Sequence, residues 1–295
     1  MRVTQSVIAE MLKSDIQRNL KRLQESQEMI SSGKRILSPS DDPSAVGRLI
    51  GYKVELSQSE QILEDIENAL AFLNTADSVL ADAENLVSRA REIAIEMASD
   101  TANAQDRIQA ADEIRQIKGQ LIQIANTSVA GQYIFGGTKT TEPPYEISGD
   151  QVIYKGNSGV ILRQIGSDET IQVNVPGHEI FGNGEVGLFK TLSDLERALT
   201  SNDIGGIRDA ADELKVNHET ILSARAKIGG YSQRVRFAKS SIEGLKEQLE
   251  RMMSQIEDVD LAEASIQLAR NDNAYKASLL AAARLLQSSL LDFLG

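Results

Sequence analysis

Apolar residues recur with a seven-residue period along two long stretches of the chain. In the first stretch, eleven positions spaced alternately four and three residues apart are all apolar. They are Ile62, Ile66, Ala69, Leu73, Ala76, Leu80, Ala83, Val87, Ala90, Ala94 and Met97. In the second stretch, fifteen of sixteen such positions from Ile207 to Val259 are apolar, and Asn217 is the exception. A repeat of 3.5 residues held over this length predicts long helices whose apolar stripes each follow a partner helix.

A shorter helix is predicted over Asp106–Thr127, where apolar residues again share one face. These residues are Ile114, Ile117, Leu121 and Ile124. Residues 99–103 break the chain before this helix, and the simplest arrangement of the three elements is an antiparallel bundle. Gly229 and Gly230 lie inside the second long stretch, where each glycine costs up to about 1 kcal/mol. The sequence leaves open whether they mark a close helix crossing or a local break.

Both ends of the chain show weaker amphipathic patterns. The N-terminal apolar positions are Leu12, Ile16, Leu20, Leu23 and Ile30. The C-terminal positions are Leu279, Ala283, Leu286, Leu290 and Phe293, with Leu261, Leu268 and Tyr275 on a neighbouring row. Isolated helices of this length are marginally stable in water. We therefore expect these residues to form assembly interfaces, either with the other end of the same chain or between subunits.

Residues 145–190 have a different composition, with no alanine and eight of the 21 glycines. Short strands are predicted at 152–154, 160–162 and 170–175, and Ile171, Val173 and Val175 share one face of the last strand. The predicted fold is mainly α: a long antiparallel coiled-coil or helical-bundle rod built from both ends of the chain, with a small inserted β-rich domain.

The predicted domain organisation follows from these patterns. Residues 1–45 and 262–295 are expected to be terminal assembly helices. Residues 46–140 and 191–261 are expected to form the helical bundle rod, and residues 141–190 a small β-rich domain.

Composition and charge exclude several classes of protein. The 295 residues carry a formal charge of −12, which argues against sequence-independent DNA binding. No apolar stretch reaches about 18 residues, the length that predicts a membrane-spanning helix. The charged residues of the first fifteen positions predict no cleavable secretory signal. The absence of cysteine excludes disulfides, thiolate metal ligands and cysteine nucleophiles.

Short motifs that suggest chemistry have simpler structural interpretations. Ser31-x-x-Lys34 matches a motif of serine acyl-enzymes, but Gly33 favours a helix end. The sequon at Asn126 favours a helix C-terminus and turn over a glycosylation site. Gly182-Asn183-Gly184 lacks the strand–turn–helix context of a phosphate-binding loop.

Two acidic pairs admit similar alternatives. Asp258 and Asp260 lack the further oxygen donors of a calcium loop and favour a helix end. Asp41-Asp42-Pro43 favours a helix start, and the alternative is that these carboxylates meet Arg35 or Lys34 across a subunit contact. The two histidines, His178 and His218, receive no role. We therefore expect no enzyme activity, no cofactor and no metal site.

Several segments resemble the bacterial flagellin family. The resemblance rests on Ser31-Ser32-Gly33-Lys34-Arg35-Ile36 followed by Ser40-Asp41-Asp42-Pro43, on Arg89–Ala94, and on the stretch from Asp258-Val259-Asp260 through Ala269-Arg270-Asn271 to the Leu-rich end. It covers residues 1–140 and 205–295. Within the family, Pro43, the segment Gly131–Gly137 and the ending Phe293-Leu294-Gly295 favour the junction branch over filament flagellin.

The resemblance implies an extracellular structural subunit of the flagellum, exported through the type III apparatus without a cleaved signal. It implies that the subunit joins the hook to the filament. It also implies that the terminal helices of residues 1–45 and 262–295 are disordered in the monomer and pair in a coiled coil on assembly, and that residues 141–190 form an outer domain. The implied partners are further copies of the chain in a ring or helical array, the first hook-associated protein, flagellin, and an export chaperone at the C-terminal helix. Neither nucleic acid nor a membrane is an expected partner. A short filament flagellin and a cytoplasmic coiled-coil scaffold are the alternatives.

Overall fold

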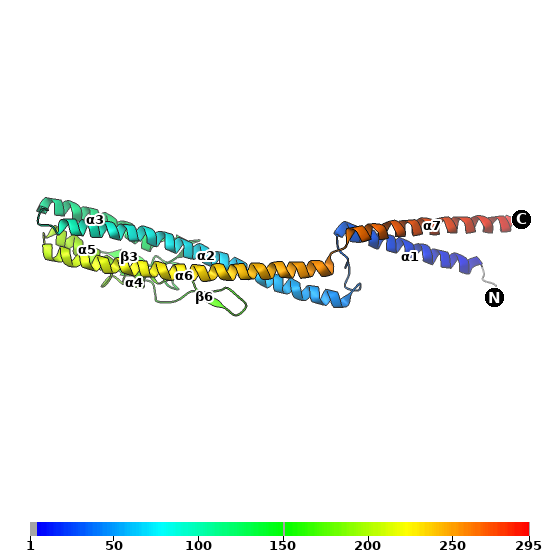
Figure 1. The fold of residues 1–295 in the computed structure, drawn as a ribbon, viewed down its shortest axis with the longest axis horizontal. Helices are drawn as coiled ribbons and strands as arrows, with labels where there is room; N and C mark the ends of the chain where they lie inside the picture. Colours follow the sequence, from blue (N-terminus) through cyan, green and yellow to red (C-terminus); the bar gives the residue numbers. More distant parts are fainter. Residues whose placement is uncertain (1–4, 150, 295) are drawn as a thin grey trace. The chain divides into compact units, whose positions relative to one another are not determined.

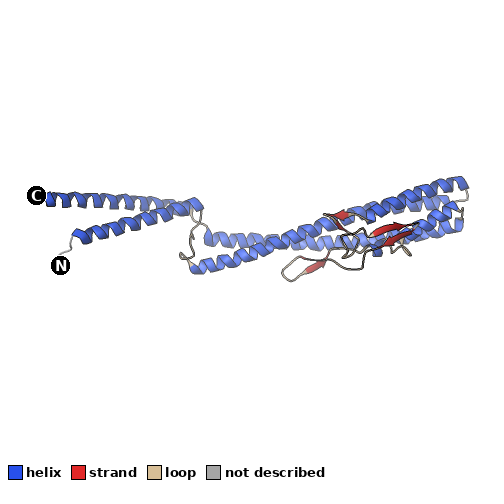
Figure 2. Ribbon diagram, turned by 180° about the vertical axis from the view of Figure 1, so that it is seen from behind, coloured by secondary structure: helices blue, strands red, loops and turns tan. Residues whose placement is uncertain are grey.

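The computed structural model of the protein is mainly helical, with short hairpin strands inserted between long helices (Figures 1 and 2). It describes residues 5–149 and 151–294, and the side chains of these residues except 5, 6, 8, 9 and 285–294. The helices are α1 (Gln5–Ser32), α2 (Pro43–Met97), α3 (Ala104–Ala125), α4 (Gly177–Ile180), α5 (Leu188–Thr200), α6 (Ile204–Glu257) and α7 (Leu261–Leu294). The strands are β1 (Ser128–Val129), β2 (Gln132–Tyr133), β3 (Tyr145–Ser148), β4 (Gln151–Tyr154), β5 (Leu162–Gln164) and β6 (Thr170–Gln172).

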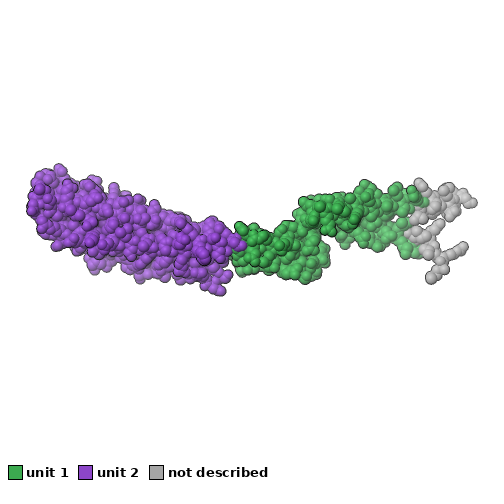
Figure 3. All heavy atoms as spheres, viewed as in Figure 1, with its two compact units in different colours: residues 1–58, 245–295 green, residues 59–244 purple. Residues whose placement is uncertain are grey.

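The chain forms two compact units (Figure 3). The first consists of residues 1–58 and 245–295, and the second consists of residues 59–244. Helices α2 and α6 each contribute to both units. The first unit also contains the terminal helices α1 and α7, and the second contains α3, α5 and all the described strands.

The seven-residue repeats form the core of the second unit. All eleven positions of the first repeat are buried, with no more than 9% of any of them exposed. In α6, the corresponding positions from Ile207 to Val235 are also buried or half-buried. Ion pairs at the edge join the two helices: Arg225 Nε lies 3.0 Å from Asp77 Oδ1, and Lys239 Nζ lies 3.1 Å from Glu67 Oε1. The predicted helical fold class is confirmed.

Helix α3 begins at a capping box formed by Asn103 and Asp106. The side chain of Asn103 accepts hydrogen bonds from the N–H groups of Gln105 and Asp106, and the Asp106 carboxylate accepts one from the N–H of Asn103. This reciprocal capping box satisfies donors that a helix start leaves without partners. At the other end, Asn126 is the C-cap, and its side chain bonds both the N–H and the C=O of Tyr145. The prediction of a helix end at Asn126 is confirmed.

The prediction of a three-element bundle is incomplete, because the second unit contains the additional helix α5. Seven of the thirteen residues of α5 are buried, including Leu188, Leu192 and Leu195. Glu196 of α5 bonds Arg115 and Lys118 of α3, and Thr191 of α5 bonds Glu213 of α6. The helices therefore follow the order α2, α3, α5, α6 around the core.

The inserted strands form antiparallel hairpins, β3 with β4 and β5 with β6. Ile171, Val173 and Val175 are buried as expected, but the strand predicted at 170–175 ends at Gln172, and Asn174, which is 1% exposed, breaks the predicted alternation. The strand predicted at 160–162 is shifted to Leu162–Gln164. The reason is Asn174, whose side chain accepts a hydrogen bond from the Ile161 N–H and thereby replaces a ladder partner.

Aromatic side chains join the hairpins to the helical core. Tyr145 contacts Phe181 edge-on and Phe189 with ring centroids 5.1 Å apart, and its hydroxyl donates to the carbonyl of Gly182. Phe135 lies edge-on to Phe181 at 5.3 Å. Burial raises the pKa of the Tyr145 hydroxyl far above its usual value. The buried residues of the insert and of the helices thus form one continuous core.

Gly229 and Gly230 do not interrupt helix α6. Helix α6 continues through both residues, they are exposed, and a Cβ added to either would have no other heavy atom within 4 Å. The structure therefore shows neither a break nor a close crossing of two helices of this chain at these positions.

Candidate assembly surfaces

Helices α1 and α7 lie side by side, and the first residues of α1 are at the same end of the pair as the last residues of α7 (Figure 1). The least exposed residues of α1 are spaced four and three apart. They are Leu12, Ile16, Asn19, Leu23, Ser26 and Ile30. The structure therefore places Leu12, Ile16, Leu23 and Ile30, four of the five N-terminal candidates, on the row that faces α7. Leu20 lies off this row and is 37% exposed.

The row of α7 that faces α1 differs from the one chosen as the C-terminal interface. It consists of Ala264, Leu268, Asn271, Tyr275, Ser278 and Ala282. Leu279 is 42% exposed and Ala283 is also exposed. The side chains of Leu286, Leu290 and Phe293 lie outside the described residues. Within the chain, α1 thus covers the neighbouring row, and the described candidates on α7 face away from it.

A polar contact sets the register of the terminal pair. Asn271 Nδ2 donates to Ser26 Oγ at 2.6 Å and to the carbonyl of Arg22 at 3.2 Å. Ser26 is 1% exposed. An asparagine in a helix seam favours one register at a cost in stability, because any slip leaves its amide without these partners. The 4-3 spacing that continues through Asn271 is the signal that sequence analysis missed.

The terminal pair buries little apolar surface. Among the described side chains of α1 and α7, the buried apolar ones are Leu23 and Ala264. Large apolar side chains remain exposed on both helices, each between 37% and 64%. They are Val7, Met11, Leu20, Leu261, Ile266, Leu279 and Leu280. Exposed apolar residues in this number make the terminal pair a candidate surface for contact with another protein.

The two linkers between the terminal helices and the long helices bind each other. The N–H of Val259 donates to the carbonyl of Gly33, and the N–H of Arg35 donates to the carbonyl of Glu257. The Arg35 guanidinium also donates to the carbonyl of Ile256 at 2.8 Å, and Lys34 Nζ lies 2.6 Å from Glu257 Oε1. Arg35 and Lys34 therefore satisfy the C-terminal end of α6 within one chain, where a cation is favourable.

Asp41 and Asp42 have local partners as well. Asp42 Oδ1 accepts from the N–H of Ala45 and caps α2, whose first residue is Pro43, so the predicted helix start is confirmed. Asp41 Oδ2 accepts from the N–H groups of Ser38 and Leu37. The hydrogen bond from the Ser38 N–H is the main reason that the pKa of the Asp41 carboxyl is below its usual value. The hydrogen bond from the Ala45 N–H is the main reason for the lowered pKa of the Asp42 carboxyl.

The other motifs examined in the sequence are also local turns and caps. Helix α1 ends at Ser32, and Gly33 follows with φ +71°. Asp260 Oδ1 accepts from the N–H groups of Ala262 and Glu263 and caps α7. Asn183 Oδ1 closes a turn by accepting from the N–H groups of Glu185 and Val186.

The two histidines lie apart from these surfaces. His218 Nε2 is 3.7 Å from Glu84 Oε1, and the His178 ring lies 5.6 Å from that of Tyr154. In the described part of the chain, no three His, Cys, Asp or Glu side chains gather as metal ligands would. A search of the same residues finds no helix that is long and apolar enough to cross a membrane.

Comparison with known proteins places both ends of the chain in one family. Residues 3–140 match the bacterial flagellin N-terminal helical region, and residues 213–294 match the bacterial flagellin C-terminal helical region. Flagellar hook-associated protein 3 of Escherichia coli is 26% identical over 226 residues, which are 68% of this chain and 71% of that protein. A flagellin of Bacillus subtilis is 24% identical and matches over 94% of each chain.

Solved structures show the same fold. A putative flagellar hook-associated protein from Vibrio parahaemolyticus superposes with a TM-score of 0.70 at 21% identity, covering 74% of this chain and all of that one. Flagellar hook-associated protein 3 from Legionella pneumophila superposes with a TM-score of 0.63 at 14% identity, covering 70% of this chain and 98% of that one.

Proposed function

The chain belongs to the bacterial flagellin family, and on that premise we propose that it is the junction protein that joins the hook to the flagellin filament. It is a structural component of the flagellum, outside the cell, and not an enzyme. The observation that carries the proposal is the terminal helix pair, which leaves large apolar side chains exposed on both helices. The similarity to hook-associated protein 3 supports the junction over other positions in the flagellum.

The proposed mechanism couples folding of the terminal helices to assembly. Ordering a backbone residue costs about 1–2 kcal/mol in conformational entropy. Full burial of a leucine, isoleucine or phenylalanine side chain contributes about 1.5–3 kcal/mol. The α1·α7 pair alone fully buries few apolar side chains, so the balance in an isolated chain is near zero or unfavourable. Neighbouring subunits that cover Leu279, Leu280 and Ile266 reverse that balance.

The proposed partners follow from the position at the junction. Hook and filament components lie on either side of a junction protein, and we assign the hook-side contact to the first hook-associated protein and the filament-side contact to flagellin. Further copies of the chain complete the ring or helical array. An export chaperone that covers the C-terminal helix before assembly would bind the same exposed apolar residues of α7, Ile266, Leu279 and Leu280.

A second candidate is a short filament flagellin, because the Bacillus subtilis flagellin matches over 94% of both chains. Antibody labelling of intact flagella separates the two. We expect a single labelled band at the hook–filament boundary, with flagella from a strain that lacks the gene as the control. Label along the whole filament would establish the flagellin alternative, and protein that stays in the cell after flagella are sheared off would contradict both.

A further inference from the structure

The two linkers of the first unit together form a folded element, the linker clasp, which comprises residues 33–37 and 256–260. Lys34 and Asp258 face each other in an antiparallel β-bridge. The backbone hydrogen bonds on either side of this bridge are 2.7 and 3.0 Å long. The Lys34 ammonium also pairs with Glu257, whose side chain is 14% exposed. Two segments far apart in the sequence are therefore joined at the end of α1 and the start of α7.

A small apolar cluster anchors the clasp to the long helices. Ile36 of the clasp is 9% exposed and packs with Ala45 and Leu49 at the start of α2. Ile256 at the end of α6 packs against the same cluster. Burial of these side chains stabilises the clasp, and the described members of the cluster all come from the linker, α2 and α6. The clasp can therefore fold without α1 or α7.

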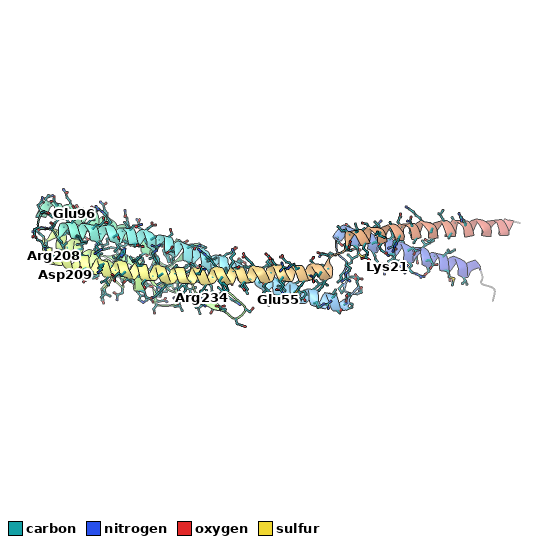
Figure 4. All side chains as sticks on the ribbon, in the orientation of Figure 1. Lys21, Glu55, Glu96, Arg208, Asp209 and Arg234 are labelled. Atoms are coloured by element: carbon teal, nitrogen blue, oxygen red, sulfur yellow. The ribbon has the colours of Figure 1, made fainter. Side chains whose placement is uncertain are left out.

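The terminal helices have less to stabilise them than the clasp has. Lys21, which Figure 4 labels on α1, pairs with Glu25 of the same helix, and both side chains are exposed. Exposed pairs one turn apart contribute little to stability. Among the described side chains of α1 and α7, the three buried ones are Leu23, Ser26 and Ala264, all in the half of their helix nearest the clasp. Burial in the pair therefore decreases away from the clasp.

The clasp also positions the end of α1 and the first turn of α7. A free linker over residues 33–42 would let the end of α1 move over roughly 15–20 Å. In the clasp, Gly33 directly follows the last residue of α1 and accepts a hydrogen bond from the N–H of Val259. The next residue, Asp260, caps α7. Because a helix is costly to start and easier to extend, a held and capped start favours pairing from this end.

We propose that the linker clasp is folded in the isolated chain and is the nucleus from which α1 and α7 pair, so that pairing proceeds from the clasp toward Leu12 and Ala282. The inference rests on the proposed function, because it identifies where the terminal helices begin the folding that assembly completes. Pairing that starts at the clasp reaches the hydrogen bond between Asn271 and Ser26 before it reaches Leu12. The register is therefore set before the exposed half of the pair forms.

Hydrogen exchange in the purified full chain, resolved by residue, tests the proposal. We expect the N–H groups of Arg35 and Val259 to exchange at least about tenfold more slowly than in an unfolded chain, because both are donors in the clasp. Protection should then decrease along α1 from Leu23 to Leu12. Exchange of Arg35 and Val259 at the unfolded rate would overturn the inference, as would equal protection along the whole of α1.

One substitution should open the clasp. Arg35→Ala removes the guanidinium that donates to the carbonyl of Ile256. We expect exchange at Val259 and at Leu23 to become about threefold faster or more, because the pair loses its nucleus. The matched control, Arg48→Ala, removes an exposed arginine of α2 in the same unit and should leave both amides unchanged. Faster exchange at Val259 without any change at Leu23 would show that the clasp is not a nucleus.

A disulfide across the clasp should reverse this effect, and the chain has no cysteine that would interfere. Lys34 and Asp258 are a non-hydrogen-bonded pair, since the bonds come from the residues on either side. The Cα atoms of such a pair lie about 4.5 Å apart, a distance that a disulfide spans. Adding Lys34→Cys and Asp258→Cys to Arg35→Ala should restore the protection of Leu23 after oxidation, with the reduced form as the control. Thiols that do not join, or a disulfide that leaves Leu23 unprotected, would overturn the inference.

These measurements use the isolated chain, so failure of the inference is distinct from failure of the proposed function. Loss of protection in the clasp would overturn the inference and leave the junction standing. Antibody label along the whole filament would reject the junction and leave the clasp standing.

Discussion

At the scale of single residues, Arg107 illustrates how a buried charge organises one end of the helical bundle. It is 4% exposed, and its guanidinium donates to the carbonyls of Met97 and Ser99 and to Asn202 Oδ1. It thus joins the end of α2, the start of α3 and the turn before α6. Nothing in the hydrophobic repeat predicts this role, because it depends on three backbone segments that only the folded chain brings together.

Replacing Arg107 should therefore destabilise the bundle. Arg107→Met keeps much of the volume but leaves buried carbonyls without donors, and we expect a loss of roughly 2–3 kcal/mol in the free energy of unfolding. Chemical denaturation followed by circular dichroism measures it. Arg197→Ala, which removes an arginine with a 73% exposed side chain, is the control and should change stability by less than about 0.5 kcal/mol. Equal effects of the two substitutions would show that Arg107 is not a structural link.

Glu196 gives the bundle a pH dependence. Burial acts to raise its pKa, but hydrogen bonds from Lys118 and Arg115 outweigh burial and hold the pKa below the ordinary value of 4.5. A carboxyl with a lowered folded pKa stabilises the fold above its unfolded pKa, and this contribution is lost as the pH falls through the folded pKa.

We therefore expect Glu196→Gln to lower the melting temperature at pH 7, by an amount equivalent to roughly 1 kcal/mol or less. The difference from the natural chain should disappear in acid, once the pH is below the folded pKa of Glu196. Glu92→Gln is the control, since that side chain is 69% exposed. A difference that persisted or grew in acid would contradict the assignment.

At the scale of elements, the seven-residue repeat was a reliable guide because α2 and α6 each follow a partner for most of their length. The same reasoning was less successful for α7. Two adjacent rows of α7 both fit the 4-3 spacing, and the chosen row contained the larger residues. The row that faces α1 carries Asn271, whose amide requires Ser26, so the partner helix decided which row is covered.

The glycines of α6 provide a prediction about one element. Because Gly229 and Gly230 are helical, exposed and free of neighbours, replacing each with alanine should stabilise the chain by up to about 1 kcal/mol. Thermal unfolding of the purified chain measures this effect. Gly33→Ala is the opposing control, since its φ of +71° strains an alanine and should destabilise the protein. Destabilisation by alanine at 229 or 230 would mean that another segment approaches α6 closely.

At the scale of the whole molecule, burial is distributed unequally between the two units. The second unit has one continuous apolar core, whereas the terminal pair buries few apolar side chains and exposes many. This imbalance supports our proposal that the bundle is stable alone while the ends depend on neighbouring subunits. We hypothesise that deleting Gln287–Gly295 leaves the bundle folded and stops assembly.

The deletion is tested by comparing thermal unfolding of the purified protein with its recovery from sheared flagella. Leu280→Asp is a finer test, because Leu280 is 62% exposed and its substitution should affect assembly alone. Asn273→Asp, an exposed polar change on the same helix, is the matched control and should be incorporated normally. Normal incorporation of the deletion variant would refute the hypothesis.

Elements whose cause is local could be predicted from the order of residues alone. The repeats of α2 and α6, the cap at Asp42 and the helix end at Gly33 depend on neighbours within a few residues, so the order of residues along the chain contains the necessary information. Other features became clear only in the folded chain: the docking of α5 against α3, the shift of β5 caused by Asn174, the link made by Arg107, and the row of α7 that stays exposed. Each of these features depends on a contact with a residue outside its own element. Burial and hydrogen bonding in the folded chain determine which of the available contacts forms.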